Sequence, residues 1–277
     1  MGRCNAIGLF AGCAWLAGVG AGDGRAAELF NGRDLAGFST WLRDTRHEDP
    51  RGVFTVTNGW IRISGDGLGY LATRQSFAHY RLLVEFKWGT LNTPWNDRVG
   101  RARDSGIFLH ATGPDGNSHD GDGAFMAAIE CNLFQGATGD ILLIRGKDAA
   151  GRLIAPRLTA RVAPERDADG WWFWHGQGRL QTIETWGRLN WFGKSRAWRD
   201  ELDFRGPQDP ERPYGEWNTV ECACDGNRLA IRLNGHLVNE AFDLRPNRGK
   251  ILFQCEGSEI FIRRVAVFER GASRTAK

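Results

Sequence analysis

Short runs of alternating apolar and polar residues, each ended by turn residues, constrain the fold of this chain most strongly. Successive side chains of a strand point to opposite faces, so such runs predict strands with one buried face. Asn58-Gly59 and Asn234-Gly235 separate adjacent runs, and Asn-Gly is a strong signal for a tight hairpin. No long segment shows a helical period. We therefore expect an all-β jelly-roll sandwich of two antiparallel sheets. The expected strands cover 53–56, 60–64, 80–88, 106–110, 127–134, 140–145, 219–224, 228–233, 236–239, 250–256 and 260–268.

The first 27 residues have the pattern of an export signal rather than of a folded segment. Arg3 is followed by an apolar, Ala- and Gly-rich run over 6–21, and small residues at 19–21 and 26–27 suit signal peptidase cleavage. The run is too short for a transmembrane anchor. We expect cleavage near 21–27 and a periplasmic or extracellular protein, with lipid attachment at Cys13 as a less favoured alternative.

The rest of the chain, 28–277, is expected to form one domain with a long insertion at about 163–213. This segment is rich in Trp, Arg, Gly, Asp and Pro, and we expect a loop laid over one sheet face. Its indole rings can form a small core that holds the loop down, or can offer a flat surface to a sugar ring. Trp191 is the candidate for such a sugar contact. The net charge of +3 and the scattered arginines do not indicate nucleic-acid binding.

Four cysteines remain after the signal, which would permit disulfides in an oxidising compartment. Each occupies the apolar side of its alternating run, so we expect buried thiols that pack as small hydrophobic groups. No cysteine spacing indicates a zinc site. The four are Cys131, Cys222, Cys224 and Cys255.

Ionisable and amide side chains occupy positions of three runs where alternation turns them away from the core. Together they offer a proton acceptor, a partner acid and two hydrogen-bonding amides, if the strands share a sheet. The alternative is that they are solvated residues of an outer face. These candidates are His110, Glu130, Asn132, Gln254 and Glu256.

The segment 117–123, rich in Asn, Asp and Gly, superficially resembles a calcium loop. It lacks the closing bidentate Glu, and Asp and Asn also cap turns by binding their own backbone. His119 and Asp120 are therefore kept as candidate ligand contacts beside the outward-facing residues.

Several motifs, in order, resemble the 3-keto-disaccharide hydrolase family over about Leu29 to Phe268. They include LFNGRDLAGF, DSGIFLHATGPDG, AAIECNLFQGATGD, GEWNTVECACDGNRLAIRLNGHLVNEA and GKILFQCEGSEIFIRRVAV. The resemblance implies a concanavalin- or laminarinase-like jelly roll. It also implies action on glycosides that a separate sugar 3-dehydrogenase has oxidised to a ketone at C3. Family members are 1,2-lyases and hydratases whose combined reaction is hydrolysis.

A ketone at C3 acidifies the proton at C2, so a carboxylate or imidazole can remove it while the aglycone leaves C1. We take Glu130 or His110 as the base and Glu256 as the second acid or base. Arg145, Lys194 and Gln254 are candidates to polarise the ketone. A divalent metal ion held by His110 and Glu130 would serve the same purpose.

Two other functions compete with this one. A carbohydrate-binding module would use the same fold and aromatic residues without a base. A conventional two-carboxylate glycosidase is less favoured, because Asn132 and Phe134 interrupt the E-x-D-x-E strand pattern of jelly-roll glycosidases.

Overall fold

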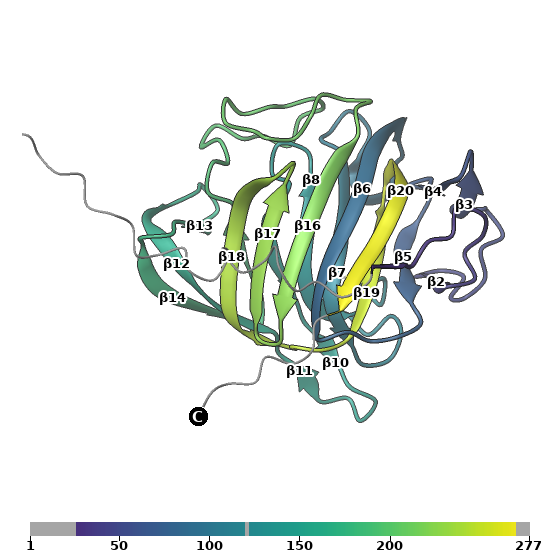
Figure 1. Cartoon of the computed structure of the whole chain (residues 1–277), viewed down its shortest axis with the longest axis horizontal. Helices are drawn as coiled ribbons and strands as arrows, with labels where there is room; N and C mark the ends of the chain where they lie inside the picture. Colours follow the sequence, from purple (N-terminus) through teal and green to yellow (C-terminus); the bar gives the residue numbers. More distant parts are fainter. Residues whose placement is uncertain (1–25, 120–121, 270–277) are drawn as a thin grey trace, which may run out of the picture.

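The computed structural model describes residues 26–119 and 122–269, and in them nearly all regular structure is β-strand (Figure 1). A single 3₁₀ turn, η2 (Trp95–Asp97), interrupts the strands. The expected all-β jelly-roll sandwich is therefore confirmed. Within these ranges no helix has the length and apolarity that a membrane span requires. The expected signal segment lies almost wholly outside the described residues, which begin at Ala26.

One layer, here the outer sheet, faces the viewer in Figure 1. It is antiparallel, and β6 lies at its centre between β16 and β20. The short strand β1 (Ala27–Glu28) also pairs with β20. In spatial order the outer sheet contains β3 (Phe54–Thr57), β4 (Trp60–Ile63), β20 (Ser258–Glu269), β6 (His79–Asn92), β16 (Asn218–Asp225), β17 (Arg228–Leu233), β18 (His236–Arg245), β12 (Arg157–Arg166) and β14 (Arg179–Glu184).

The second layer lies behind it and is here called the cleft sheet. β19, β7 and β8 form its centre, and their antiparallel registers decide which side chains meet. A separate two-stranded ribbon joins β10 (Gly146–Lys147) to β11 (Leu153–Ile154). In spatial order the cleft sheet contains β2 (Phe38–Leu42), β5 (Leu68–Thr73), β19 (Lys250–Glu256), β7 (Asp104–Thr112), β8 (Ala127–Phe134), β9 (Ile141–Ile144) and β15 (Gly187–Asn190).

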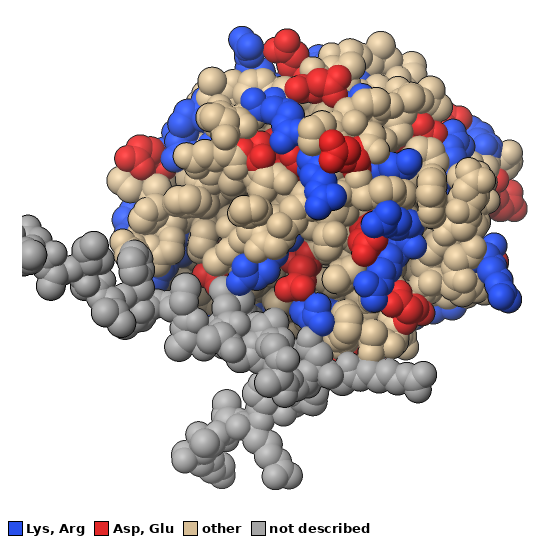
Figure 2. Space-filling model, turned by 45° about the horizontal axis from the view of Figure 1, so that its top comes forward, with Lys and Arg blue, Asp and Glu red and all other residues tan. Residues whose placement is uncertain are grey.

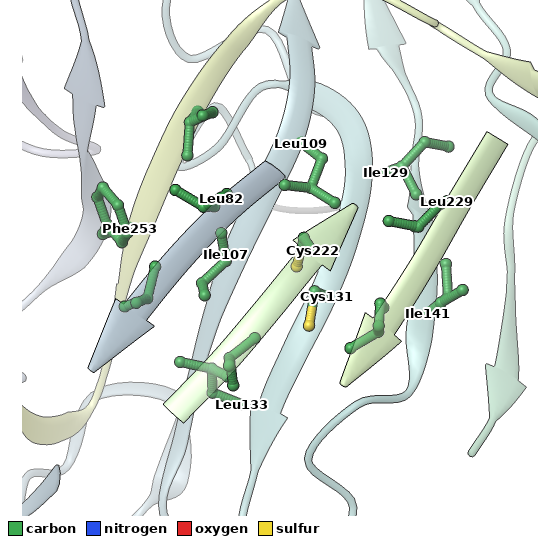
Figure 3. Packing of buried hydrophobic residues seen from close by; sticks show 14 of the residues in the cluster. Leu82, Ile107, Leu109, Ile129, Cys131, Leu133, Ile141, Cys222, Leu229 and Phe253 are labelled. Carbon is green, nitrogen blue, oxygen red and sulfur yellow. The ribbon is translucent and has the colours of Figure 1, made fainter. Parts of the chain in front are cut away.

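The main core lies between the two sheets, where alternate residues of facing strands interdigitate (Figure 3). Burying a large apolar side chain in this core contributes about 1.5–3 kcal/mol to the stability of the folded protein. All four cysteines of the described chain are buried and free, which confirms that they pack as small hydrophobic groups. Cys131 and Cys222 meet across the sheets, and their hydrogen bond, with burial, holds the pKa of the Cys222 thiol well above its usual value (Figure 3).

The segment 163–213 contains strands, so it is not the loop laid over one sheet face that we expected. β12 continues to Arg166, and two more strands follow it: β13 (Trp172–Trp174) and β14. β15 then joins the cleft sheet beside β9, and β13 pairs with both β12 and β15. The segment thus connects the two sheets along one side of the sandwich. The longest stretch of the segment without a strand follows Asn190 and continues until β16 begins at Asn218. The density of Trp and Arg obscured the alternation of these short strands.

Candidate functional site

The centre of the cleft sheet carries a row of polar side chains on the face away from the main core. In the β7–β8 register Gly106 lies opposite Asn132 and Phe108 opposite Glu130. Leu252 of β19 lies opposite Phe108 on the other side, so continuing that register brings Gln254 next to Gly106. Residues of equal parity on neighbouring strands share a face, which places these side chains together.

This face is hollowed into a cleft of about 390 Å³. Three carboxyl groups, two amides and one guanidinium group occupy its polar part, and aliphatic and aromatic side chains form an apolar wall. The polar residues on the strands are Asp104, Glu130, Glu256, Asn132, Gln254 and Arg188; the wall is formed by Leu68, Phe125, Leu142 and Ile144. Three polar residues outside the strands, Arg43, Asn96 and Asp122, also line the cleft. Four of the predicted residues thus come together: Glu130, Asn132, Gln254 and Glu256.

Both amides have a carbonyl oxygen without a partner. Gln254 is 2% exposed and Asn132 is 3% exposed, and neither Oε1 of the first nor Oδ1 of the second accepts a hydrogen bond. A buried acceptor left unpaired costs about 1–3 kcal/mol, so such groups usually have a function. In a cleft they are suited to the hydroxyl groups of a ligand.

Gly106 makes room for the side chains of Glu130 and Gln254. A Cβ atom on Gly106 would lie 2.3 Å from Oε1 of Glu130 and 2.9 Å from Oε1 of Gln254. The absence of a side chain at this position therefore allows the Glu130 carboxyl and the Gln254 amide to converge over β7.

The three carboxyl groups resist ionisation. Burial, and then the charge of Asp104, raise the pKa of Glu130 to about 8. Burial raises the pKa of Asp104 to about 7, against the opposing effects of Arg98 and Arg188. Burial followed by the charges of Asp104 and Glu130 also holds the pKa of Glu256 well above its usual value. Near neutral pH the cleft therefore contains carboxyl groups that can accept and donate protons.

His110 is not in the cleft, and its predicted outward orientation is wrong. The β7–β8 register shifts between Leu109 and Thr112, and His110 itself has φ of 58°. This bulge breaks the alternation and turns the ring inward, where it is 0% exposed and packs edge-on against Tyr80 at 5.7 Å. Its Nδ1 donates to the Pro246 carbonyl, and burial lowers its pKa to about 4.

His110 and Glu130 therefore do not come together, and the metal site that we expected between them is not formed. Within residues 26–119 and 122–269, no group of three or more His, Cys, Asp and Glu side chains could hold a metal ion. In the 117–123 segment, the Asn117 amide and the Ser118 hydroxyl bind backbone groups of the flanking chain and of β10 instead. Asp120 lies outside the described residues.

Four other predicted contacts lie away from the cleft. Trp191 is 4% exposed and belongs to the main core. The Nζ of Lys194 is bound to Asp140 and Asn190. The backbone of His119 donates to the carbonyl of Arg145, and neither side chain lines the cleft.

Sequence reasoning missed two polar residues on the strands of the cleft. Asp104 has the same parity on β7 as Gly106 and Phe108, so alternation, extended two residues, would have found it. Arg188 alternates with the buried Leu189, but its strand belongs to the segment that we expected to be a loop.

Several solved structures are similar to this chain at low identity. A candidate glycosyl hydrolase from Parabacteroides distasonis ATCC 8503 is 15% identical, with a TM-score of 0.48 over 89% of this chain and 94% of that one. The β-glucanase of Bacillus licheniformis is 13% identical, with a TM-score of 0.45 over 90% and 100%. The carbohydrate-binding module CBM66 of Bacillus subtilis is 11% identical, with a TM-score of 0.43 over 83% and 93%.

No curated protein sequence matches this chain. A family model does match, and it covers residues 25–267, which include all of both sheets except the last two residues of β20, and every residue of the cleft. The chain therefore belongs to the family of the 3-keto-alpha-glucoside-1,2-lyase-like domain.

Proposed function

We propose that this carbohydrate-active protein cleaves 3-keto-glycosides, by elimination across C1 and C2 followed by addition of water. The observation that carries the proposal is the cluster of three carboxyl groups, the buried Asp104 and Glu130 and the half-buried Glu256, beside two amides with unpaired acceptors. Family membership supports the 3-keto substrate.

In the first step the Glu130 carboxylate removes the proton from C2, which the C3 ketone makes acidic. The bond between C1 and the glycosidic oxygen breaks, and Glu256 gives its proton to the departing oxygen. In the second step water adds to C1 as Glu256 takes a proton from it, and Glu130 returns a proton to C2. Both carboxyl groups end in their starting states, and the sum is hydrolysis.

The raised pKa values of these groups suit the two roles. A base that titrates near neutral pH exists partly as carboxylate and binds the abstracted proton well. A partner whose pKa is held well above its usual value retains a proton to donate. Repulsion between the charges favours one ionised and one protonated group, as the first step requires.

The test compares a 3-keto-glucoside with its unoxidised parent, with and without a chelator. We expect cleavage of the keto-glycoside alone, with deuterium incorporated at C2 in D₂O beyond an enzyme-free blank. Glu130→Gln should abolish turnover, whereas Glu165→Gln, at an exposed carboxyl of β12, should leave it unchanged. Cleavage of the parent alone would refute the proposal in favour of a conventional glycosidase. Binding without cleavage of either compound would indicate a carbohydrate-binding module.

We also propose that the protein is exported and that a sugar 3-dehydrogenase supplies its substrate. The signal-like pattern of the first 27 residues supports export. Expression of the full chain in a Gram-negative host should place it in the periplasm, with an N-terminus near residues 21–27 by mass spectrometry. Retention in the cytoplasm with an intact N-terminus would contradict export.

A further inference from the structure

We infer that Arg188 is a catalytic residue that binds the oxygen of the C3 ketone as it becomes an enolate, and that Asp140 and Lys194 position it. This inference rests on the proposed function. Abstraction of the C2 proton moves negative charge onto the ketone oxygen, and a preorganised cation at that oxygen stabilises the transition state.

Arg188 is the cation of the cleft best placed for this contact. Arg188 lies opposite Leu142, and Leu142 lies opposite Glu130, so the guanidinium and the base lie in one row of the sheet. Strands are about 4.8 Å apart, so two strands separate the two Cα atoms by about 10 Å. Both side chains stand on the cleft face, so a sugar ring lying over Leu142 can contact both of them.

The other cations near the cleft are differently placed. Arg98 forms a two-pronged ion pair with Asp200, at 3.0 and 2.9 Å. Arg43 stands on the opposite side, where its backbone binds that of Leu68. Arg188 opposes the rise in pKa of all three cleft carboxyl groups, which agrees with a position close to each of them.

Arg188 is held in place without being neutralised. Its only ion-pair partner within 4 Å in the described chain is Asp140, at 3.5 Å from Nη1 to Oδ2, which is longer than a charge-assisted hydrogen bond. The same Oδ2 accepts from the Nζ of Lys194 at 2.9 Å. One carboxylate thus lies between two cations, which leaves a positive charge for the cleft.

Asp140 is itself rigidly placed. It is 0% exposed, and its Oδ1 accepts from the backbone N–H of Trp191 at 2.7 Å. The Nζ of Lys194 is fixed further by Oδ1 of Asn190 at 2.7 Å. Because Lys194 occupies the Asp140 carboxylate, it weakens the attraction between Asp140 and Arg188. Lys194 therefore acts on the ketone through two other residues, not by direct contact as the sequence suggested.

The decisive experiment measures enolate formation separately from cleavage. A 3-keto sugar with no substituent at C1 cannot eliminate, so exchange of its C2 proton in D₂O reports the base and the enolate stabiliser alone. We expect the wild-type protein to catalyse exchange. Arg188→Met should slow both exchange and cleavage by about 10²–10³-fold, the usual cost of losing one such donor, with little change in KM.

Two further readouts separate catalysis from structural support. Guanidinium ion should restore part of the activity of Arg188→Ala, and loss of the positive charge should shift the pH–rate profile of Arg188→Met to higher pH. Asp140→Asn should lower kcat more than it raises KM. The control is Arg152→Met, at an exposed arginine whose pair with Asp148 lies outside the cleft. Each variant is compared by its thermal melting curve, so that a misfolded protein is recognised.

If a folded Arg188→Met protein exchanges the C2 proton as fast as the wild type does, the inference is overturned and the proposed function remains intact. Absence of both exchange and cleavage in the wild-type protein would instead overturn the proposed function, and this inference with it. Undiminished kcat in a folded Asp140→Asn protein would overturn the positioning role.

Discussion

Gly106→Ala should inactivate the protein without unfolding it. The added Cβ would lie 2.3 Å from Oε1 of Glu130, and ordinary van der Waals contact begins near 3.4 Å, so the carboxyl must retreat by about 1.1 Å. A misplacement of about 1 Å in a catalytic group costs on the order of 100-fold in rate. We expect a loss of that size in kcat on a 3-keto-glucoside.

The fold should tolerate the same substitution. The atoms nearest to the new Cβ are the ends of the Glu130 and Gln254 side chains, which can rotate, and the backbone of Gly106 does not have a positive φ. Alanine also restricts the unfolded chain more than glycine does. Differential scanning calorimetry should therefore give a Tm equal to or slightly above that of the wild type.

Gly176→Ala is the matched control, because its Cβ would meet only the Trp174 ring, at an ordinary 3.8 Å. Full activity of a folded Gly106→Ala protein would refute the assignment of Glu130 as the base. A folded protein with 100-fold lower kcat and unchanged Tm would support it.

Three further outcomes follow from the structure. Folding raises the pKa of the Glu130 carboxyl from 4.5 to about 8, so its contribution to stability is complete below pH 4.5 and is lost as the pH rises through 8. The Tm of the wild-type protein should therefore fall between about pH 5 and 8.5. An equally steep fall of Tm in Glu130→Gln would contradict this. His110→Asn should keep its activity, because Asn tolerates the positive φ at this position. It should lose about 0.5–1.5 kcal/mol of unfolding free energy, because the ring contact with Tyr80 is lost. A folded but inactive variant would show that His110 takes part in the reaction. Leu229→Ala, in the core of the outer sheet, should cost about 2–5 kcal/mol in urea denaturation and spare activity, whereas a cost below 1 kcal/mol would question the packing in Figure 3.

Alternation along regular strands predicted much of the site. Glu130, Asn132, Gln254 and Glu256 were placed on one face because β8 and β19 keep their period without interruption over these residues. Periodicity of two is a local property, so it holds wherever the strand is regular. The same pattern correctly assigned the four buried cysteines.

Alternation failed to predict site residues whose positions depend on a bulge or on pairing between distant strands. No Gly or Pro at His110 or beside it in the sequence indicates a bulge, and only the register with β8 shows where the alternation of β7 is broken. Arg188 reaches the cleft because three residues of β15 pair with β9, a contact between segments more than forty residues apart. Such pairing depends on the closing of the whole sandwich, which short-range patterns do not encode.

The pairing of β15 with β9 has a consequence for solubility. β9 consists of Ile141, Leu142, Leu143 and Ile144, and without β15 this wholly aliphatic strand would be an open edge. An exposed apolar edge is a template for pairing with a second molecule, which leads to aggregation. β15 covers that edge and presents a charged arginine beside it. Changes that loosen this short strand should therefore reduce both turnover and the yield of soluble protein, so losses of activity by this route will often appear as losses of expression.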